Sequence, residues 1–271
     1  MELAAYLRRI GYSGAVRPDL GTLRALHRAH LLTIPYDALD IQFGRPVTID
    51  PATAYQKIVE RGRGGWCYEM NGLFGWALQS AGFEVIRHSA EGGEPASHLV
   101  LEVRLGGQSY VCDVGFASGP LEPYPLVEGA FVQRGFEYRL EKLRSGWRFH
   151  NHPFALTSGF SFDGPDEPAM AERCRLLQSD PDSTYVLNAI VVRNNAHGYS
   201  MMLGRELRRV NPHGRTRETI ASASAYVATL RDLFGLDLPE AADLWPSICR
   251  RHEQIEAQRT ARVDGQGAAN R

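Results

Sequence analysis

The chain has 271 residues, of which 44% are hydrophobic, and its formal net charge is −1. This length allows one large domain or two to three small ones with proper cores. The balanced charge gives no electrostatic reason to expect a nucleic acid or a membrane surface as partner.

The first part of the chain, to about Phe83, has a helical pattern. Apolar residues at helical spacing fill "LGTLRALHRAHLL", and Asp50 followed by Pro51 is typical of a helix start. From Cys67 onward, apolar residues recur at steps of three and four until Gly82. This repeat predicts a helix with one buried face.

From Phe83 to about Val192 the apolar period becomes two. Short strands with glycine-rich turns are predicted at "FEVIRHS", "SHLVLEVRL", "SYVCDVGF", "FEYRLEKL" and "GWRFHNH". The segment "EPAMAERCRLL" predicts a helix among them. The pattern as a whole favours an antiparallel sheet or a small barrel.

The remainder of the chain mixes strands and helices. Strands are predicted at "YVLNAIVVR" and "GYSMML", and a helix at "ASAYVATLRDLFG" that ends at Gly235. Another helix follows with a kink or break at Pro246, and the polar end from Thr260 is expected to be frayed. We predict an α+β fold with three subdomains, at residues 1–84, 85–192 and 193–271.

The four cysteines are sparse and include no CxxC pair, which favours reduced thiols and a cytoplasmic location. They are Cys67, Cys112, Cys174 and Cys249. No apolar run reaches membrane-spanning length, and the first residues lack the pattern of a secretory signal.

Cys67 lies in "RGGWCYEMNGLF", where Gly64 and Gly65 form a tight turn before the predicted helix. Unpaired N–H groups and the helix dipole favour a thiolate in a first helical turn. Arg63 is close in sequence and adds positive charge. A buried structural cysteine fits this motif equally well, because a thiol needs a base before it counts as a catalyst.

The best base is His98, for a geometric reason. Gly106 and Gly107 predict a two-residue hairpin turn, which pairs Leu101 with Cys112. His98 and Asp113 then share the opposite face as diagonal neighbours, within side-chain reach. A cysteine, a histidine and an aspartate in this arrangement are a nucleophile, a general base and the group that orients the base.

Three motifs, "RGGWCYEMNGLF", "SHLVLEV" and "YVCDVGF", together resemble the arylamine N-acetyltransferases. The resemblance runs from about Ala5 to about Leu236. It implies a helical bundle, a β-barrel and an α/β lid around a catalytic core like that of cysteine proteases. It implies a catalytic triad of Cys67, His98 and Asp113.

The resemblance also implies a reaction and its reactants. Cys67 would take an acetyl group from acetyl-coenzyme A as a thioester and pass it to an arylamine, hydrazine or arylhydroxylamine, a ping-pong reaction of xenobiotic metabolism. The loop after Asp113 would shape the coenzyme A cleft, so Gly115 and Phe116 are candidate cofactor contacts, with Ser97. The family motif has glycine where this chain has Ala117. We expect no metal, no nucleic acid and no membrane partner.

Two histidine pairs are candidate metal ligands. His27 with His30, and His150 with His152, each share a face but have no third ligand at metal spacing. We interpret both pairs as structural or surface residues. Asn71, one helical turn from Cys67, is a candidate supporting residue, whereas Glu69 and Tyr68 are expected to hold the helix in place.

Other functions fit the same residues. An amide synthase could use the same fold and triad to release an acyl chain by amide formation. A thiol hydrolase would need no coenzyme A. A binding protein with a relict triad would keep its function without the Cys67 thiol. The acceptor amine, the range of acyl donors and the oligomeric state are left open by the sequence.

Overall fold

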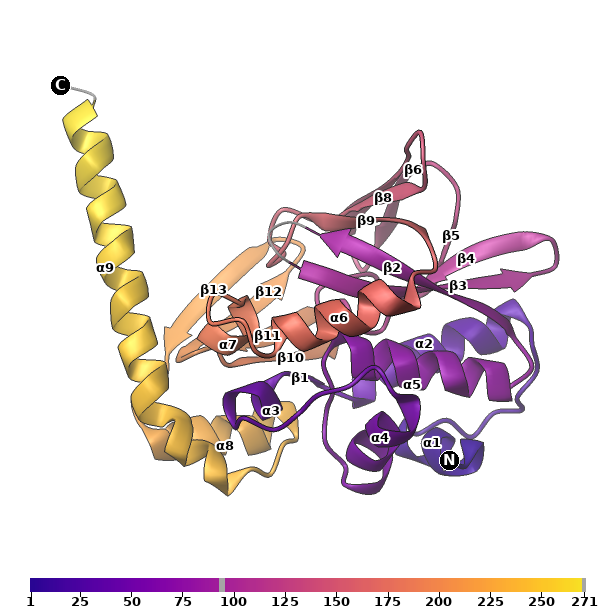
Figure 1. Cartoon of the computed structure of the whole chain (residues 1–271), viewed down its shortest axis with the longest axis horizontal. Coiled ribbons are helices and arrows are strands. Elements are labelled where there is room, and N and C mark those ends of the chain that lie inside the picture. The colour runs from indigo at the N-terminus through magenta and orange to yellow at the C-terminus, as the bar shows by residue number, and fades with distance from the viewer. Residues whose placement is uncertain (93–95, 270–271) are drawn as a thin grey trace.

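The structure, a computed structural model, describes the backbone of residues 1–92 and 96–269 and the side chains of residues 1–91 and 98–259 (Figure 1). The N-terminal part is helical, as predicted. Its elements are α1 (Leu3–Arg9), α2 (Leu20–Thr33), α3 (Leu39–Gln42), α4 (Pro51–Tyr55), the π-helix η1 (Gln56–Glu60) and α5 (Cys67–Ser80).

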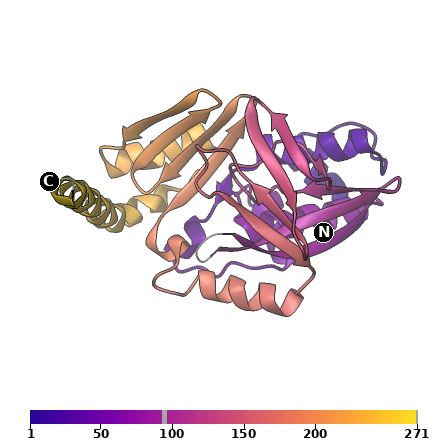
Figure 2. The same ribbon diagram turned by 90° about the horizontal axis from the view of Figure 1, so that it is seen from above.

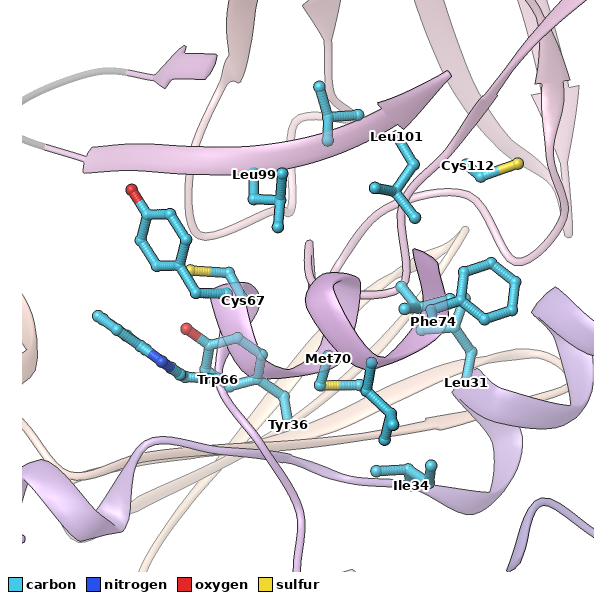
Figure 3. Close-up of a cluster of buried hydrophobic side chains, with 14 of the residues drawn as sticks. Leu31, Ile34, Tyr36, Trp66, Cys67, Met70, Phe74, Leu99, Leu101 and Cys112 are labelled. Carbon is cyan, nitrogen blue, oxygen red and sulfur yellow. The ribbon is translucent and has the colours of Figure 1, made fainter. Parts of the chain in front are cut away.

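Helix α5 is the centre of the molecule and is buried on most of its surface, not on one face only. It packs against α4 and against two strands of the central sheet, β2 (Glu84–Gly92) and β3 (Ala96–Leu105). Figure 3 shows Leu99 and Leu101 above the helix that carries Cys67, Met70 and Phe74. The helix is therefore a rigid support for the cysteine at its first position.

The central part is an eight-stranded antiparallel sheet with the spatial order β5-β4-β3-β2-β9-β8-β7-β6. Its strands are β2 (Glu84–Gly92), β3 (Ala96–Leu105), β4 (Gln108–Cys112), β5 (Tyr124–Pro125), β6 (Gly129–Gln133), β7 (Phe136–Lys142), β8 (Trp147–His150) and β9 (Gly159–Gly164). The sheet curls without closing. Its two edge strands approach each other through the rings of Tyr124 and Phe131, whose centroids lie 4.8 Å apart.

The β3–β4 hairpin has the predicted two-residue turn. Gly106 and Gly107 have φ of 59° and 79°, a conformation that glycine adopts without strain. Leu101 pairs with Cys112, as the sequence predicted. Strand β4 ends at Cys112, so Asp113 is the first residue after the ladder.

The C-terminal part contains a five-stranded antiparallel sheet with the order β1-β10-β11-β12-β13 (Figure 1). Its strands are β1 (Tyr36–Asp37), β10 (Ile190–Asn195), β11 (Gly198–Leu203), β12 (Glu206–Asn211) and β13 (Gly214–Thr219). The helices of this half are α6 (Glu167–Leu177), α7 (Thr184–Leu187), α8 (Ala223–Phe234), the 3-10 helix η2 (Pro239–Leu244) and α9 (Trp245–Ala269). Because β1 comes from the helical part, this sheet connects the helical part with the C-terminal part.

Two local predictions are wrong. The start of "YVLNAIVVR" is the short helix α7 and not a strand, because Ser183 caps a helix there. The polar end is not frayed at Thr260, since the backbone of α9 is helical to Ala269 and projects away from the rest of the chain (Figures 1 and 2). Within residues 1–92 and 96–269, every helix is too short or too polar to cross a lipid bilayer.

Candidate active site

Cys67 is the first residue of α5 and is almost fully buried, with 2% of its surface exposed. The backbone before it is fixed by a parallel bridge between Gly65 and Tyr36. The N–H of Trp66 donates to Glu69 Oε2 at 3.2 Å, which caps the helix start. The position of the thiol is thus set by the helix and by β1.

A buried network of charges lies behind this helix start. Lys57 Nζ lies 2.8 Å from Glu69 Oε2 and 2.8 Å from Asp40 Oδ2. Arg63 donates to Asp37 at 2.7 Å and to Asp40 at 3.1 Å. The expectation that Arg63 adds positive charge at the thiol is therefore wrong, because two carboxylates neutralise it. Glu69 holds the helix in place, as predicted.

His98 and Asp113 are in direct contact. Nε2 of His98 donates to Oδ2 of Asp113 at 2.7 Å, and both side chains are buried. Since Nε2 carries the proton of this bond, Nδ1 is the ring nitrogen left to accept a proton. The ring of His98 packs against those of Phe116 and Phe160, at centroid distances of 5.4 and 5.1 Å.

The other oxygen of Asp113 accepts three hydrogen bonds. Asn71 Nδ2 donates to Oδ1 at 2.8 Å, and the backbone N–H groups of Gly115 and Phe116 donate to it at 3.0 and 2.9 Å. Asn71 also accepts from the N–H of Val114 at 2.9 Å. The carboxylate is therefore held in one orientation by helix α5 and by its own loop.

A cavity of about 250 Å³ contains the cysteine and the histidine. Its wall is mostly apolar and comes from both sheets and from α5 and α7. The lining residues are Tyr36, Cys67, His98, Gly115, Phe116, Ala117, Ser118, Leu156, Thr157, Gly159, Phe160, Thr184, Tyr185, Ile190, Val192, Tyr199 and Met201. A small molecule in this cavity would lie against the thiol and the imidazole together.

The sequence is similar to those of known proteins. A family model described as N-acetyltransferase matches residues 19–243. The arylamine N-acetyltransferase of Mycobacterium tuberculosis is 30% identical over 262 residues, covering 90% of this chain and 92% of that protein. The chain belongs to the arylamine N-acetyltransferase family. The Mycolicibacterium smegmatis member is 44% identical over 156 residues, which are 52% of this chain and 57% of that protein.

Solved arylamine N-acetyltransferases also share the fold. The Mycobacterium marinum enzyme in complex with CoA has a TM-score of 0.84 and 28% identity, covering 91% of this chain and 98% of that one. The M. smegmatis enzyme has a TM-score of 0.83 and 30% identity, covering 92% and 97%. The predicted fold class, α+β with a helical part, a curled antiparallel sheet and a C-terminal α/β part, is confirmed. The ranges given for the three subdomains remain a prediction.

The loop that the family resemblance assigned to coenzyme A lies against the helix start. A Cβ on Gly115 would lie 2.6 Å from the carbonyl oxygen of Cys67, so only glycine lets the loop approach this closely. Gly115 and Phe116 both line the cavity. The backbone of Ser97 belongs to β3, but its side chain lies outside the described residues. Ala117 fits without positive φ and accepts a hydrogen bond from Asn194 at 3.1 Å.

His27 is a supporting residue that the sequence pattern did not indicate. His27 Nε2 accepts from the backbone N–H of Asp113 at 3.1 Å, and its Nδ1 donates to the carbonyl of Leu121 at 2.9 Å. Burial lowers the pKa of His27 to about 4, so its ring is neutral at neutral pH. The helical face shared by His27 and His30 was noticed, but nothing in the sequence linked it to Asp113.

The thiol itself is less acidic than its helix position predicted. Burial raises the pKa of Cys67 well above its ordinary value, and the N–H of Tyr68 only partly offsets this. A thiolate at this position therefore needs a proton acceptor beside it. Among the residues that the structure describes, no three His, Cys, Asp or Glu side chains are grouped as metal ligands.

Proposed function

We propose that this family member moves an acetyl group from acetyl-coenzyme A through a Cys67 thioester to an arylamine, hydrazine or arylhydroxylamine. One observation carries the proposal. The buried Cys67 and the imidazole of His98, which is hydrogen-bonded to Asp113, line the same small cavity. The relative from M. marinum, solved with CoA, supports the choice of donor. Cys67, His98 and Asp113 would be the catalytic residues.

In the first half-reaction, Nδ1 of His98 takes the proton of the Cys67 thiol. The thiolate attacks the carbonyl carbon of acetyl-coenzyme A, and a new C–S bond forms. The C–S bond to coenzyme A then breaks, and the imidazolium returns its proton to the departing thiolate. Asp113 stabilises the imidazolium through the bond to Nε2 and does not itself take the proton.

In the second half-reaction, the amine nitrogen attacks the thioester carbonyl of Cys67. The C–N bond forms and the C–S bond to the protein breaks. His98 takes the proton that the amine loses and passes it to the thiolate of Cys67. The free thiol is then restored, and the product is an amide, a hydrazide or, from an arylhydroxylamine, an N-hydroxyamide.

The size of the cavity favours a small acceptor. Its volume of about 250 Å³ lies below the ~300–1,000 Å³ usual for sites that hold drug-sized ligands. A single aromatic ring with its amine and the acetyl group is of suitable size, and the rings of Phe116 and Phe160 offer it apolar surface. A long acyl chain, as an amide synthase would require, fits this space poorly.

Release of coenzyme A thiol in the presence of a simple arylamine, a hydrazine or water tests this function. We expect rapid release with the two amines, slow release with water, and none above background for the Cys67→Ala variant. The Cys249→Ala variant is the control, because Cys249 lies outside the cavity. Equal release from Cys67→Ala and the unsubstituted protein would contradict the proposal, and rapid release without an amine would favour a thiol hydrolase.

A further inference from the structure

One face of the five-stranded sheet leads from the catalytic cavity to a group of arginines. The antiparallel register aligns Tyr36, Val192, Met201, Arg208 and Arg217 in one row across β1, β10, β11, β12 and β13. The first three line the catalytic cavity. Neighbouring strands lie about 4.8 Å apart, so Arg208 on β12 is roughly 14 Å along this row from Tyr36.

A second, smaller cavity lies over the outer part of this row. Its volume is about 170 Å³, and Leu156 and Met201 belong to its wall as well as to the catalytic cavity. Arg208 and Arg215 complete its wall with apolar residues. Tyr199 also lines the catalytic cavity, and the charges of Arg134, Arg208 and Arg215 act against the rise that burial causes in the pKa of its hydroxyl.

The positive charge around the second cavity exceeds the negative charge. Glu206 pairs with three arginines: Arg208, Arg217 at 3.3 Å and Arg259 at 3.0 Å. Arg215 is exposed, and no carboxylate among the described side chains pairs with it. A guanidinium without a partner, beside a buried one, is suited to the planar recognition of a phosphate.

We propose that Arg215, together with Arg208, binds the phosphate groups of coenzyme A while the acetyl thioester lies at Cys67. This inference rests on the proposed function. The arm between the thiol and the first phosphorus of coenzyme A is about as long as an extended peptide of four residues, roughly 14 Å. Tyr36 and Cys67 line the same cavity, and this length is close to that of the row from Tyr36 to Arg208. The arm would therefore lie along β10 and β11.

The test compares acetyl-coenzyme A with S-acetylpantetheine, which keeps most of the arm but has no phosphate. The measured quantity is the second-order rate constant for acetylation of Cys67, followed by mass spectrometry at short times. The ratio of interest is the constant for acetyl-coenzyme A divided by that for S-acetylpantetheine. For Arg215→Ala this ratio should fall about tenfold, because the variant loses a charge-assisted contact that only acetyl-coenzyme A can make. Higher salt should reduce the same ratio in the unsubstituted protein.

Arg209→Ala is the matched control. Arg209 lies on the same strand but faces the other side of the sheet, where it pairs with Glu218 at 3.0 Å. Its ratio should stay within twofold of that of the unsubstituted protein. An unchanged ratio for Arg215→Ala, whether both constants fall equally or neither falls, would overturn the inference and leave the proposed function intact. No acetylation of the unsubstituted protein by either donor would instead refute the proposed function.

Discussion

At the scale of single residues, the orientation of one carboxylate decides which nitrogen of His98 can act as a base. Oδ1 of Asp113 accepts from Asn71, Gly115 and Phe116, and so only Oδ2 is available to the imidazole. The N–H at Nε2 points at this oxygen, which leaves the lone pair at Nδ1 for the thiol proton. The tautomer of His98 thus depends on the hydrogen bonds that Oδ1 of Asp113 accepts.

Asp113→Asn tests this dependence. The three donors would keep the amide oxygen at the Oδ1 position, so the amide NH₂ would face His98 and make Nε2 an acceptor. The proton would then lie on Nδ1, the wrong nitrogen for a base. We expect acetyl transfer to fall about 10⁴-fold with the fold retained. Steady-state turnover measures the fall, and near-normal activity would show that Asp113 does not orient the base.

The exposed Asp163 supplies the control for this variant. It lies in β9, away from the cavity. Asp163→Asn should therefore leave turnover unchanged. A similar loss in both variants would indicate a general effect of amide substitution and not a wrong tautomer.

The His98–Asp113 contact was predictable because two glycines fixed a turn, and the turn fixed a register. The roles of Asn71 and His27 at Asp113 were much less predictable. Both residues lie on helices, and their contacts with Asp113 join segments 42 and 86 residues apart. Arg63 was misjudged for a related reason, since its partners Asp37 and Asp40 lie 26 and 23 residues earlier in the chain.

At the scale of elements, the start of α5 depends on a buried cation. Lys57 in the π-helix η1 neutralises both Glu69 of α5 and Asp40 of α3, and all three side chains are nearly inaccessible to solvent. The glutamate in turn caps the helix that begins with Cys67. Three helical elements are thus joined at one ammonium group.

Lys57→Met should lower the free energy of unfolding by about 3–5 kcal/mol, because it leaves Glu69 buried without a cation and removes one of the cations at Asp40. Urea denaturation measures the change. Lys142→Met is the control, since Lys142 is exposed and lies over the ring of Trp147, and it should change the stability little. A loss of less than 1 kcal/mol for Lys57→Met would mean that the network does not support the helix start.

Elements with a strong apolar period were predicted well, and polar ones were not. The helix from Cys67 and the strands β2 and β3 follow directly from their spacing. Strands β12 and β13 were not identified, because their sequences are rich in arginine and the two apolar residues of β12, Leu207 and Val210, lie on opposite faces of the strand. The helix α7 was taken for a strand because its four residues are too few to show a period.

At the scale of the whole molecule, burial of histidines couples stability to pH. Burial lowers the pKa of His27 to about 4 and of His152 to about 4, compared with about 6.5 in an unfolded chain. Between these values the unfolded state binds more protons than the folded state. The stability that these neutral histidines contribute is therefore present above pH 6.5 and is lost as the pH falls toward 4.

We expect the free energy of unfolding to fall by about 1.4 kcal/mol per pH unit for each such histidine over this window. Denaturation at several values between pH 4.5 and 7.5 measures the slope. His27→Gln should reduce the slope, whereas the exposed His213→Gln should leave it unchanged. A stability that stays constant from pH 7 to pH 5 would disprove the claim that these rings are buried and neutral.

The cavity that Cys67 and His98 line is a product of the whole fold. Its wall combines Cys67 from the helical part, His98 and Phe116 from the curled sheet and its loop, and Tyr199 from the C-terminal sheet. The three parts therefore have to pack together before the thiol and the base face the same space. This explains how short motifs far apart in the sequence form a single site.

The most direct test of the account is the intact mass of the protein after brief exposure to acetyl-coenzyme A, with and without a simple arylamine. We predict one acetyl increment, located on Cys67 by peptide mapping, that disappears when the amine is added. The Cys67→Ser variant should gain no such labile increment. An unmodified protein, or an acetyl group on another residue that the amine does not remove, would contradict a thioester at Cys67.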